Sequence, residues 1–218
     1  MQNPFLPRFD LLPSTLPIFP LQNALVMPGA QLPLNIFEPR YLEMVQNVLA
    51  SHHLIGLVQP VDDENSDNPP RVHTTGGAGR ITFYNETHDG RIEIILTGIC
   101  RFDIKQEIPS ARGYRVVEPD WHRFASDYEF SALDEAADKP AFFAALDSYL
   151  QSNNLEMNRE ALQELPFAQV LNVLTTLLPL SHTEKQAILE TVPFSERYLL
   201  LTSTIEMMGS GGEPHLRH

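Results

Sequence analysis

A stretch of alternating apolar and polar residues at positions 91–105 constrains the fold of this chain more than any other feature. Its even positions, from Ile92 to Ile104, are apolar or small, whereas its odd positions are polar except for Ile95 and Ile99. A period of two sends successive side chains to opposite faces of a strand. The pattern therefore predicts one long strand with a buried face, and it places Cys100 on that face.

Shorter strand signals surround this stretch. They cover residues 16–21, 31–37, 54–61, 80–84 and 113–118. Pro17 and Pro20 punctuate the first of them, and because proline cannot donate a ladder hydrogen bond, we expect an edge strand or a bulged strand there. Pro28 and Gly29 predict a turn before the second strand. Asp89-Gly90 predicts the hairpin turn before the long strand.

The period of the apolar residues changes after Glu38. Pro39 suits the first turn of a helix, where its missing N–H costs nothing, and a carboxylate there favours the positive end of the helix dipole. Apolar residues then recur at helical spacing, at Tyr41, Met44, Val45, Val48 and Leu49. This spacing predicts an amphipathic helix that packs on the strands.

The second half of the chain has a helical pattern. It carries four amphipathic stripes, the third of which opens with a capping box at Ser181 and Glu184. Residues 62–70 are acidic and end in two prolines, which predicts a mobile loop. The whole pattern predicts an α+β chain with an N-terminal tail (1–13), a β domain (14–120), a linker (121–140), a helical bundle (141–208) and a disordered tail (209–218).

Charge and composition argue against several classes of protein. The 218 residues include 15 Lys and Arg against 28 Asp and Glu, which gives a formal net charge of −13. Nucleic-acid binders usually need a basic face, so nucleic acid is disfavoured as a partner. No stretch approaches the roughly 18 apolar residues of a membrane span, and no apolar run marks a signal peptide. A single cysteine rules out an internal disulfide. We therefore expect a cytoplasmic protein.

Several sequence blocks carry a family resemblance. They are LPIFPLQNALVMPGAQLPLNIFEPRYLEMV at 16–45, GGAGRI at 76–81 and DGRIEIILTGICRF at 89–102. Together they resemble the N-terminal domain of ATP-dependent Lon proteases, especially the short free-standing bacterial proteins built from that domain alone. LLPLSHTEKQAILETVPFSERYLLL at 177–201 is similar to the helical tail of those proteins. The resemblance implies a PUA-like β pseudo-barrel followed by a helical bundle, and a role in holding unfolded protein substrates.

The ATPase and protease activities of Lon are not implied by these blocks. The chain has no G-x-x-x-x-G-K-[ST] phosphate loop, because GGAGR at 76–80 lacks the lysine and its spacing and leads into a strand. The protease portion, with its Ser–Lys pair, has no counterpart here. We therefore expect a protein that is not an enzyme and that uses no cofactor.

Seven residues are candidates for peptide binding. They are Phe19, Phe37, Glu38, Arg40, Tyr41, Phe83 and Tyr84. Aromatic rings on an edge strand are able to line a peptide groove, although burial in the core is the competing interpretation for the rings. For Glu38 and Arg40 the competing interpretation is structural, because both lie at the start of the predicted helix.

Catalytic and metal sites are disfavoured by the same pattern. Cys100 falls on the buried face of its strand, where a cysteine usually behaves as a small inert apolar residue. His52 and His53 would point to opposite faces of a strand, so a metal site formed with His73 or His88 is not expected.

Three arginines in predicted strands also have a simple explanation. Arg80, Arg91 and Arg101 occupy positions where ion pairs across neighbouring strands account for the charge. We therefore assign them no role in binding.

The function that we expect is non-catalytic binding of unfolded or extended polypeptide segments, through apolar contacts and strand addition to an exposed edge. Protease components are further candidate partners. The alternative hypothesis is a PUA-like domain that binds RNA or a small ligand, and a third is a residual hydrolase.

Overall fold

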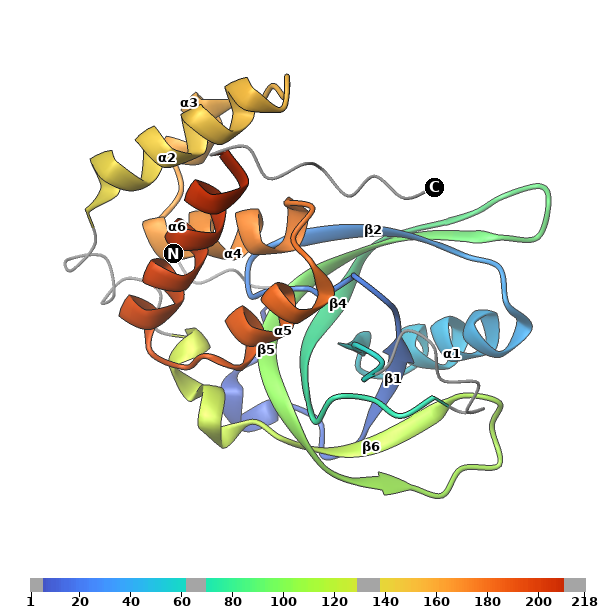
Figure 1. Cartoon of the computed structure of the whole chain (residues 1–218). Helices are drawn as coiled ribbons and strands as arrows, with labels where there is room; N and C mark the ends of the chain where they lie inside the picture. Colours follow the sequence, from blue (N-terminus) through green and yellow to red (C-terminus); the bar gives the residue numbers. More distant parts are fainter. Residues whose placement is uncertain (1–5, 62–69, 129–137, 210–218) are drawn as a thin grey trace.

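Six strands and six α-helices make up the part of the chain that the computed structural model describes, which is residues 6–61, 70–128 and 138–209 (Figure 1). The strands are β1 (Leu16–Pro20), β2 (Gln31–Ile36), β3 (Leu54–Val58), β4 (Thr75–Glu86), β5 (Ile92–Ile108) and β6 (Arg115–Asp120). The α-helices are α1 (Pro39–Leu49), α2 (Lys139–Ser152), α3 (Arg159–Gln163), α4 (Phe167–Leu177), α5 (His182–Glu190) and α6 (Phe194–Gly209). Two 3-10 helices, η1 (Phe9–Leu11) and η2 (His122–Tyr128), complete the fold. The predicted α+β class is confirmed.

The strands form one mixed sheet in the order β2-β5-β4-β3-β1-β6, and this sheet closes on itself because β6 also pairs with β5. The first half of β5 pairs with β2, and its second half pairs with β6, from Asp103 opposite Asp120 to Ile108 opposite Val116. Only the β1–β3 pair is parallel among the strands described. The result is a ring of β1, β3, β4, β5 and β6, with β2 as an added strand that pairs on one side only.

The first strand is neither an edge nor bulged along its paired residues, so this prediction of an edge strand or a bulged strand was wrong. β1 lies between β3 and β6, but the two ladders are staggered and overlap in register only at Ile18. Pro17 is in register only with β6, and Pro20 only with β3. Each proline therefore has a strand partner on one side, which lets an interior strand tolerate residues that lack the N–H donor. The true edge strand is β2.

The alternation in β5 is confirmed through its first half and gives way to burial of both faces in the middle of the strand. Even positions from Ile92 to Phe102 are buried, as predicted, and Cys100 is fully buried. Ile99 and Arg101 are buried as well. The register with β4 shifts at Ile99, which has no partner there, and Arg101 is covered by η2 and the end of α5 through Asp127 and Leu189. The simple inside–outside pattern thus ends where β5 runs under a second layer.

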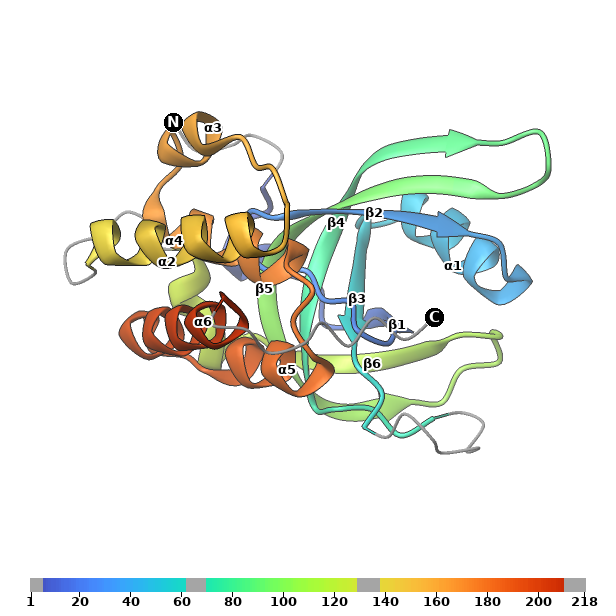
Figure 2. The same cartoon turned by 45° about the horizontal axis from the view of Figure 1, so that its top comes forward.

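Helix α1 packs on the β domain away from the other helices (Figure 2). Its N-cap is Glu38, whose side chain makes no cap hydrogen bond, and Pro39 occupies the first turn as predicted. The buried stripe of Tyr41, Met44 and Val45 shares one apolar cluster with side chains of β2, β3, β4 and β5. This stripe fixes the position of the helix N-terminus beside the sheet.

The remaining helices, α2 to α6, surround a second apolar core. Five helices occupy this region rather than the predicted four, because α3 has only five residues and too few apolar positions to show a stripe. The capping box of Ser181 and Glu184 at the start of α5 is confirmed.

Packed residues begin the segment that was predicted as a linker, 121–140. Phe124 of η2 is fully buried, and the Trp121 indole N–H donates to the Pro13 carbonyl at 3.1 Å. The predicted N-terminal tail is also partly ordered, since the Phe9 ring packs edge-on against Tyr128 with centroids 5.5 Å apart. Both segments are mainly polar in sequence, so the few apolar residues that pack against the rest of the protein were overlooked. Residues 1–5, 62–69, 129–137 and 210–218 lie outside the described part, and with them most of the predicted acidic loop and C-terminal tail.

The turn between β1 and β2 joins the β domain to the helices. Gly29 has a φ of +77°, which glycine adopts freely. Asn172 of α4 donates to the Pro28 carbonyl at 3.0 Å, and the Met27 N–H donates to the Thr176 hydroxyl at 3.2 Å. The predicted turn is confirmed, but it is an internal contact with Met27 fully buried.

Candidate functional site

A groove of about 370 Å³ lies where the open edge of β2, the start of α1 and the end of β1 meet. We call it the edge groove. It is lined by Phe19, Pro20, Leu21, Pro33, Leu34, Asn35, Phe37, Glu38, Arg40, Tyr41, Pro60 and Pro70. Aromatic rings, prolines and leucines dominate this lining, so most of the surface that it offers to a ligand is apolar.

Tyr41 organises the aromatic side of the edge groove. Its ring packs against Phe19 with centroids 4.2 Å apart, and the Arg40 guanidinium carbon lies 4.6 Å from its centroid. Arg40 also forms an ion pair with Glu38 at 2.7 Å. Burial raises the pKa of the Tyr41 phenol, so the ring stays neutral at physiological pH. Contacts within the protein therefore hold these four side chains in place.

Phe37 is the most solvent-accessible aromatic ring of the edge groove. Its exposed fraction is 63%, and the Arg91 guanidinium carbon lies 6.0 Å from its centroid. This exposed phenylalanine is one of the residues that line a mostly apolar groove. It offers a large apolar surface that a bound segment would cover.

The open edge of β2 borders the same groove. The Gly98 N–H donates to the Ala30 carbonyl at 2.8 Å, so even-numbered residues that follow in β2 direct their backbone groups toward β5. Gln31, Pro33 and Asn35 then direct theirs toward the open edge. Pro33 lacks an N–H, and proline is a residue that edge strands commonly carry.

Five of the seven predicted residues come together in this groove: Phe19, Phe37, Glu38, Arg40 and Tyr41. The other two lie on β4, away from it. Phe83 is 47% exposed and stands opposite Ile95, while the Tyr84 hydroxyl donates to Glu86. The sequence interpretation missed the prolines that wall the groove, because it treated them only as strand breakers.

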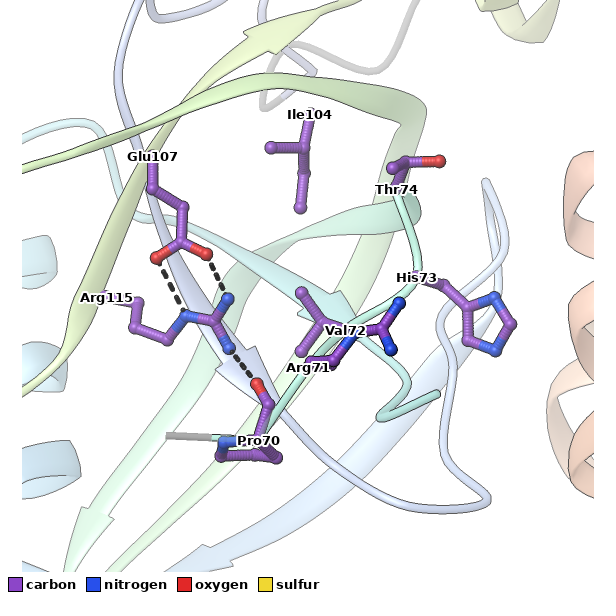
Figure 3. Close-up of a pocket in the computed structure, with 8 residues that line it drawn as sticks. All are labelled: Pro70, Arg71, Val72, His73, Thr74, Ile104, Glu107 and Arg115. Atoms are coloured by element: carbon purple, nitrogen blue, oxygen red, sulfur yellow. Dashed lines mark hydrogen bonds and ion pairs between the residues drawn. The ribbon is translucent and has the colours of Figure 1, made fainter. Parts of the chain in front are cut away.

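A second cavity of about 350 Å³ adjoins the edge groove, and the two share Pro70. We call it the arginine cavity. It is lined by Pro70, Arg71, Val72, His73, Thr74, Ile104, Glu107 and Arg115 (Figure 3). Arg115 forms an ion pair with Glu107 and donates to the Pro70 carbonyl at 2.8 Å. Sequence reasoning did not single out these arginines, which lie far apart in the chain.

The arginines of the strands behave differently from the prediction. Arg101 is not paired across strands, because its carboxylate partner is Asp127 of η2 at 2.7 Å. Arg91 pairs with Asp89 of its own hairpin turn. Local turns and the second layer of the fold, rather than the sheet, supply these partners.

The edge groove is lined mainly by rings, prolines and leucines, whereas two arginines, a histidine and a glutamate lie beside apolar residues in the arginine cavity. Burial raises the pKa of the Cys100 thiol, which keeps it protonated and unreactive. Within residues 6–61, 70–128 and 138–209, no three His, Cys, Asp or Glu side chains are grouped closely enough to hold a metal ion. In the same ranges, no helix is both long and apolar enough to cross a membrane.

Solved structures with the same fold include two from Lon proteins. The Lon N-terminal domain protein from Xanthomonas campestris has a TM-score of 0.63 at 24% identity and covers 88% of this chain and 98% of its own. The N-terminal domain of the Mycobacterium avium complex Lon protease has a TM-score of 0.61 at 15% identity and covers 88% and 97%. At these identities the likeness concerns the fold.

Sequence comparison finds the likeness within one part of Lon proteases. Lon protease from Flavobacterium johnsoniae is 26% identical over 197 residues, and peroxisomal Lon protease homolog 2 from Xenopus laevis is 26% identical over 204 residues. Each match covers 86% of this chain but only 23% or 24% of the relative, so the chain spans about a quarter of their length. The model of the ATP-dependent protease La (LON) substrate-binding domain matches residues 15–206. The chain therefore belongs to the family of LON substrate-binding domains.

Proposed function

We propose that this protein binds extended or unfolded polypeptide segments in the edge groove without acting on them chemically. The observation that carries the proposal is the position of the groove, which lies along the open edge of β2. An extended segment placed there gains main-chain hydrogen bonds from the strand and apolar contacts from the groove. Family membership supports polypeptide as the ligand, and the match to a substrate-binding domain alone supports a non-enzymatic role.

The two sides of the groove contribute differently to this binding. Carbonyl groups of Gln31, Pro33 and Asn35 accept hydrogen bonds from any sequence, because every residue except proline carries an N–H. The rings of Phe37 and Tyr41 favour apolar side chains at alternate positions of the ligand, which is the period of an extended strand. Binding is therefore broad in sequence but selective for exposed apolar segments, such as those of unfolded proteins.

The state of the single cysteine bears on where the protein acts. A chain whose one cysteine is buried as a free thiol has no disulfide that requires an oxidising compartment. We propose that it acts in the cytoplasm, where it holds unfolded segments alone or together with components of a protease.

A binding titration tests the groove. A fluorescently labelled 12-residue peptide with alternating apolar residues is titrated with the protein, and a permanently unfolded, carboxymethylated model protein serves as competitor. We expect Phe37→Ser to weaken binding about 10-fold, as loss of a large apolar anchor does. The matched control is Phe83→Ser, which removes an exposed phenylalanine outside the groove. Equal weakening by both substitutions would contradict the assignment to this groove.

Strand addition is tested separately with backbone-methylated peptides. Methylation of alternate amides removes N–H donors without changing side chains, and only one of the two alternating sets faces β2. One methylated set should bind poorly, and the other should bind like the parent peptide. Identical binding of both sets would leave the groove as a site for side chains only.

A further inference from the structure

The arginine cavity provides a second, chemically different site beside the edge groove. It places two guanidinium groups, those of Arg71 and Arg115, at one cavity whose other walls include the apolar side chains of Val72 and Ile104. Resting on the proposed function, we propose that this cavity takes a carboxylate of the polypeptide that the edge groove binds.

Arg115 is fixed in place by contacts inside the protein. Its side chain is 16% exposed, its Nε donates to Glu107 at 3.1 Å, and a terminal nitrogen donates to the Pro70 carbonyl at 2.8 Å (Figure 3). The two bonds to Glu107 and the one to Pro70 use three of the five N–H donors of a guanidinium. Two donors remain on a group whose orientation is already set, which lowers the entropic cost of holding a ligand.

Arg71 supplies the net positive charge of the cavity, because the charge of Arg115 is balanced by Glu107. Glu107 neutralises Arg115, whereas none of the ion pairs among the described residues involves the side chain of Arg71. Arg71 is exposed, so it is accessible to a ligand that enters the cavity. A planar guanidinium matches the two oxygens of a carboxylate.

The geometry ties this cavity to the edge groove through one residue. Pro70 lines both, and its carbonyl is the group that Arg115 holds. A segment that leaves the groove over Pro70 therefore arrives at the two guanidinium groups. The source of the carboxylate is either the C-terminus of the segment or an acidic side chain next to its apolar part.

The overall charge of the protein restricts the ligand further. With a net charge of −13, the chain repels acid-rich segments at long range. A single carboxylate on an otherwise apolar or basic segment meets less of this repulsion and still reaches the local positive site. The substrate class is thus an apolar segment that carries one carboxylate at its end or flank.

Three forms of one labelled 12-residue apolar peptide test the inference: a free C-terminal acid, a C-terminal amide, and an amide with one glutamate near its end. We expect wild-type protein to bind at least one of the two carboxylate forms about 10-fold more tightly than the neutral amide, as for one charge-assisted contact. Which of the two binds more tightly identifies the source. Arg71→Gln should abolish the preference while leaving amide binding unchanged. Arg159→Gln, which removes an exposed arginine on α3, is the control and should keep the preference.

The outcomes separate this inference from the proposed function. If all three forms bind equally, or if Arg71→Gln retains the preference, the carboxylate site is wrong although groove binding stands. If no peptide binds, the cavity is titrated with N-acetyl-leucine and N-acetyl-leucinamide, monitored by the backbone NMR signals of Val72 and Thr74. Shifts with the acid alone, absent in Arg71→Gln, support the cavity despite failure of the groove. No shifts with the acid, or stronger displacement of it by inorganic phosphate than by acetate, would overturn the carboxylate assignment.

Discussion

Arg101 and Asp127 form an ion pair that is shut off from solvent, with 2.7 Å between guanidinium nitrogen and carboxylate oxygen and side-chain exposures of 0% and 2%. Arg101 also donates to the carbonyl groups of Leu189 and Thr191, at 3.0 and 2.7 Å. One side chain of β5 therefore fastens η2 and the end of α5 to the β domain. Arg197 of α6 lies 3.9 Å from the same carboxylate, and burial lowers its pKa to about 10.

Removal of the carboxylate should strongly destabilise the fold. Asp127→Ala leaves two arginine side chains buried without their shared counter-charge, and we expect a loss of about 3–5 kcal/mol in the free energy of unfolding. Urea denaturation measures this loss. Asp147→Ala, which breaks an exposed pair with Arg159, is the control and should cost less than about 1 kcal/mol. Similar losses in the two variants would contradict a larger contribution of the buried pair to the free energy of unfolding.

A methyl group at Gly98 should displace the turn between β1 and β2. A Cβ atom built there lies 2.0 Å from the Met27 carbonyl oxygen, which is backbone and has no room to move aside. We expect Gly98→Ala to lower the free energy of unfolding by at least the usual cost of overpacking, which is about 1–3 kcal/mol. Gly90→Asn is a suitable control, because a Cβ there meets nothing within 4 Å and asparagine tolerates its φ of +81°. A normal urea midpoint for Gly98→Ala would contradict the close approach.

Asn172→Ala, which removes the side-chain amide, should loosen the contact between the β domain and α4. The Pro28 carbonyl would remain buried without its donor, at a cost of about 1–3 kcal/mol. Hydrogen exchange should show faster exchange of the Gly29 and Gly98 amides, whose hydrogen bonds connect this turn with β5. Gln151→Ala, on the exposed face of α2, serves as the control. Unchanged exchange at both glycines would mean that the turn keeps its place without α4.

The buried thiol of Cys100 should make stability depend on pH in the alkaline range. Burial, followed by the charge of Asp127, raises its pKa above the ordinary value of 9.0. Above that pH the unfolded chain loses the thiol proton first, so the folded state loses about 1.4 kcal/mol of relative stability per pH unit. Urea denaturation at several pH values should show wild type falling faster than Cys100→Ala above pH 9. Parallel curves would contradict the shift.

The sequence was a good guide wherever one local pattern determines the structure. The alternation of β5, the stripe of α1 and the capping box at Ser181 are all confirmed, because neighbours within one element decide them. Arg101 was misjudged for the opposite reason. Its burial depends on η2 and α5, which lie far along the chain, and no local pattern indicates what covers the outer face of a strand.

The candidate site shows the same division. Phe37, Glu38 and Tyr41 were found because they adjoin each other at the strand-to-helix transition, and Phe19 joins them through its contact with Tyr41. Phe83 was an equally good aromatic candidate by sequence, yet the register of β4 places it elsewhere. The arginine cavity was missed because its members come from the segment before β4 and from two strands, β5 and β6.

The pairing of β1 with β6 has a consequence for synthesis of the protein. Leu16 stands opposite Val117, so β1 leaves the ribosome about 100 residues before the strand β6 with which it closes the ring. Until then the nascent chain presents β1 with one side unpaired, and such non-local closure is slow compared with helix formation. The nascent protein therefore itself passes through a stage with an exposed, unpaired strand, like the extended segments that we propose as its ligands.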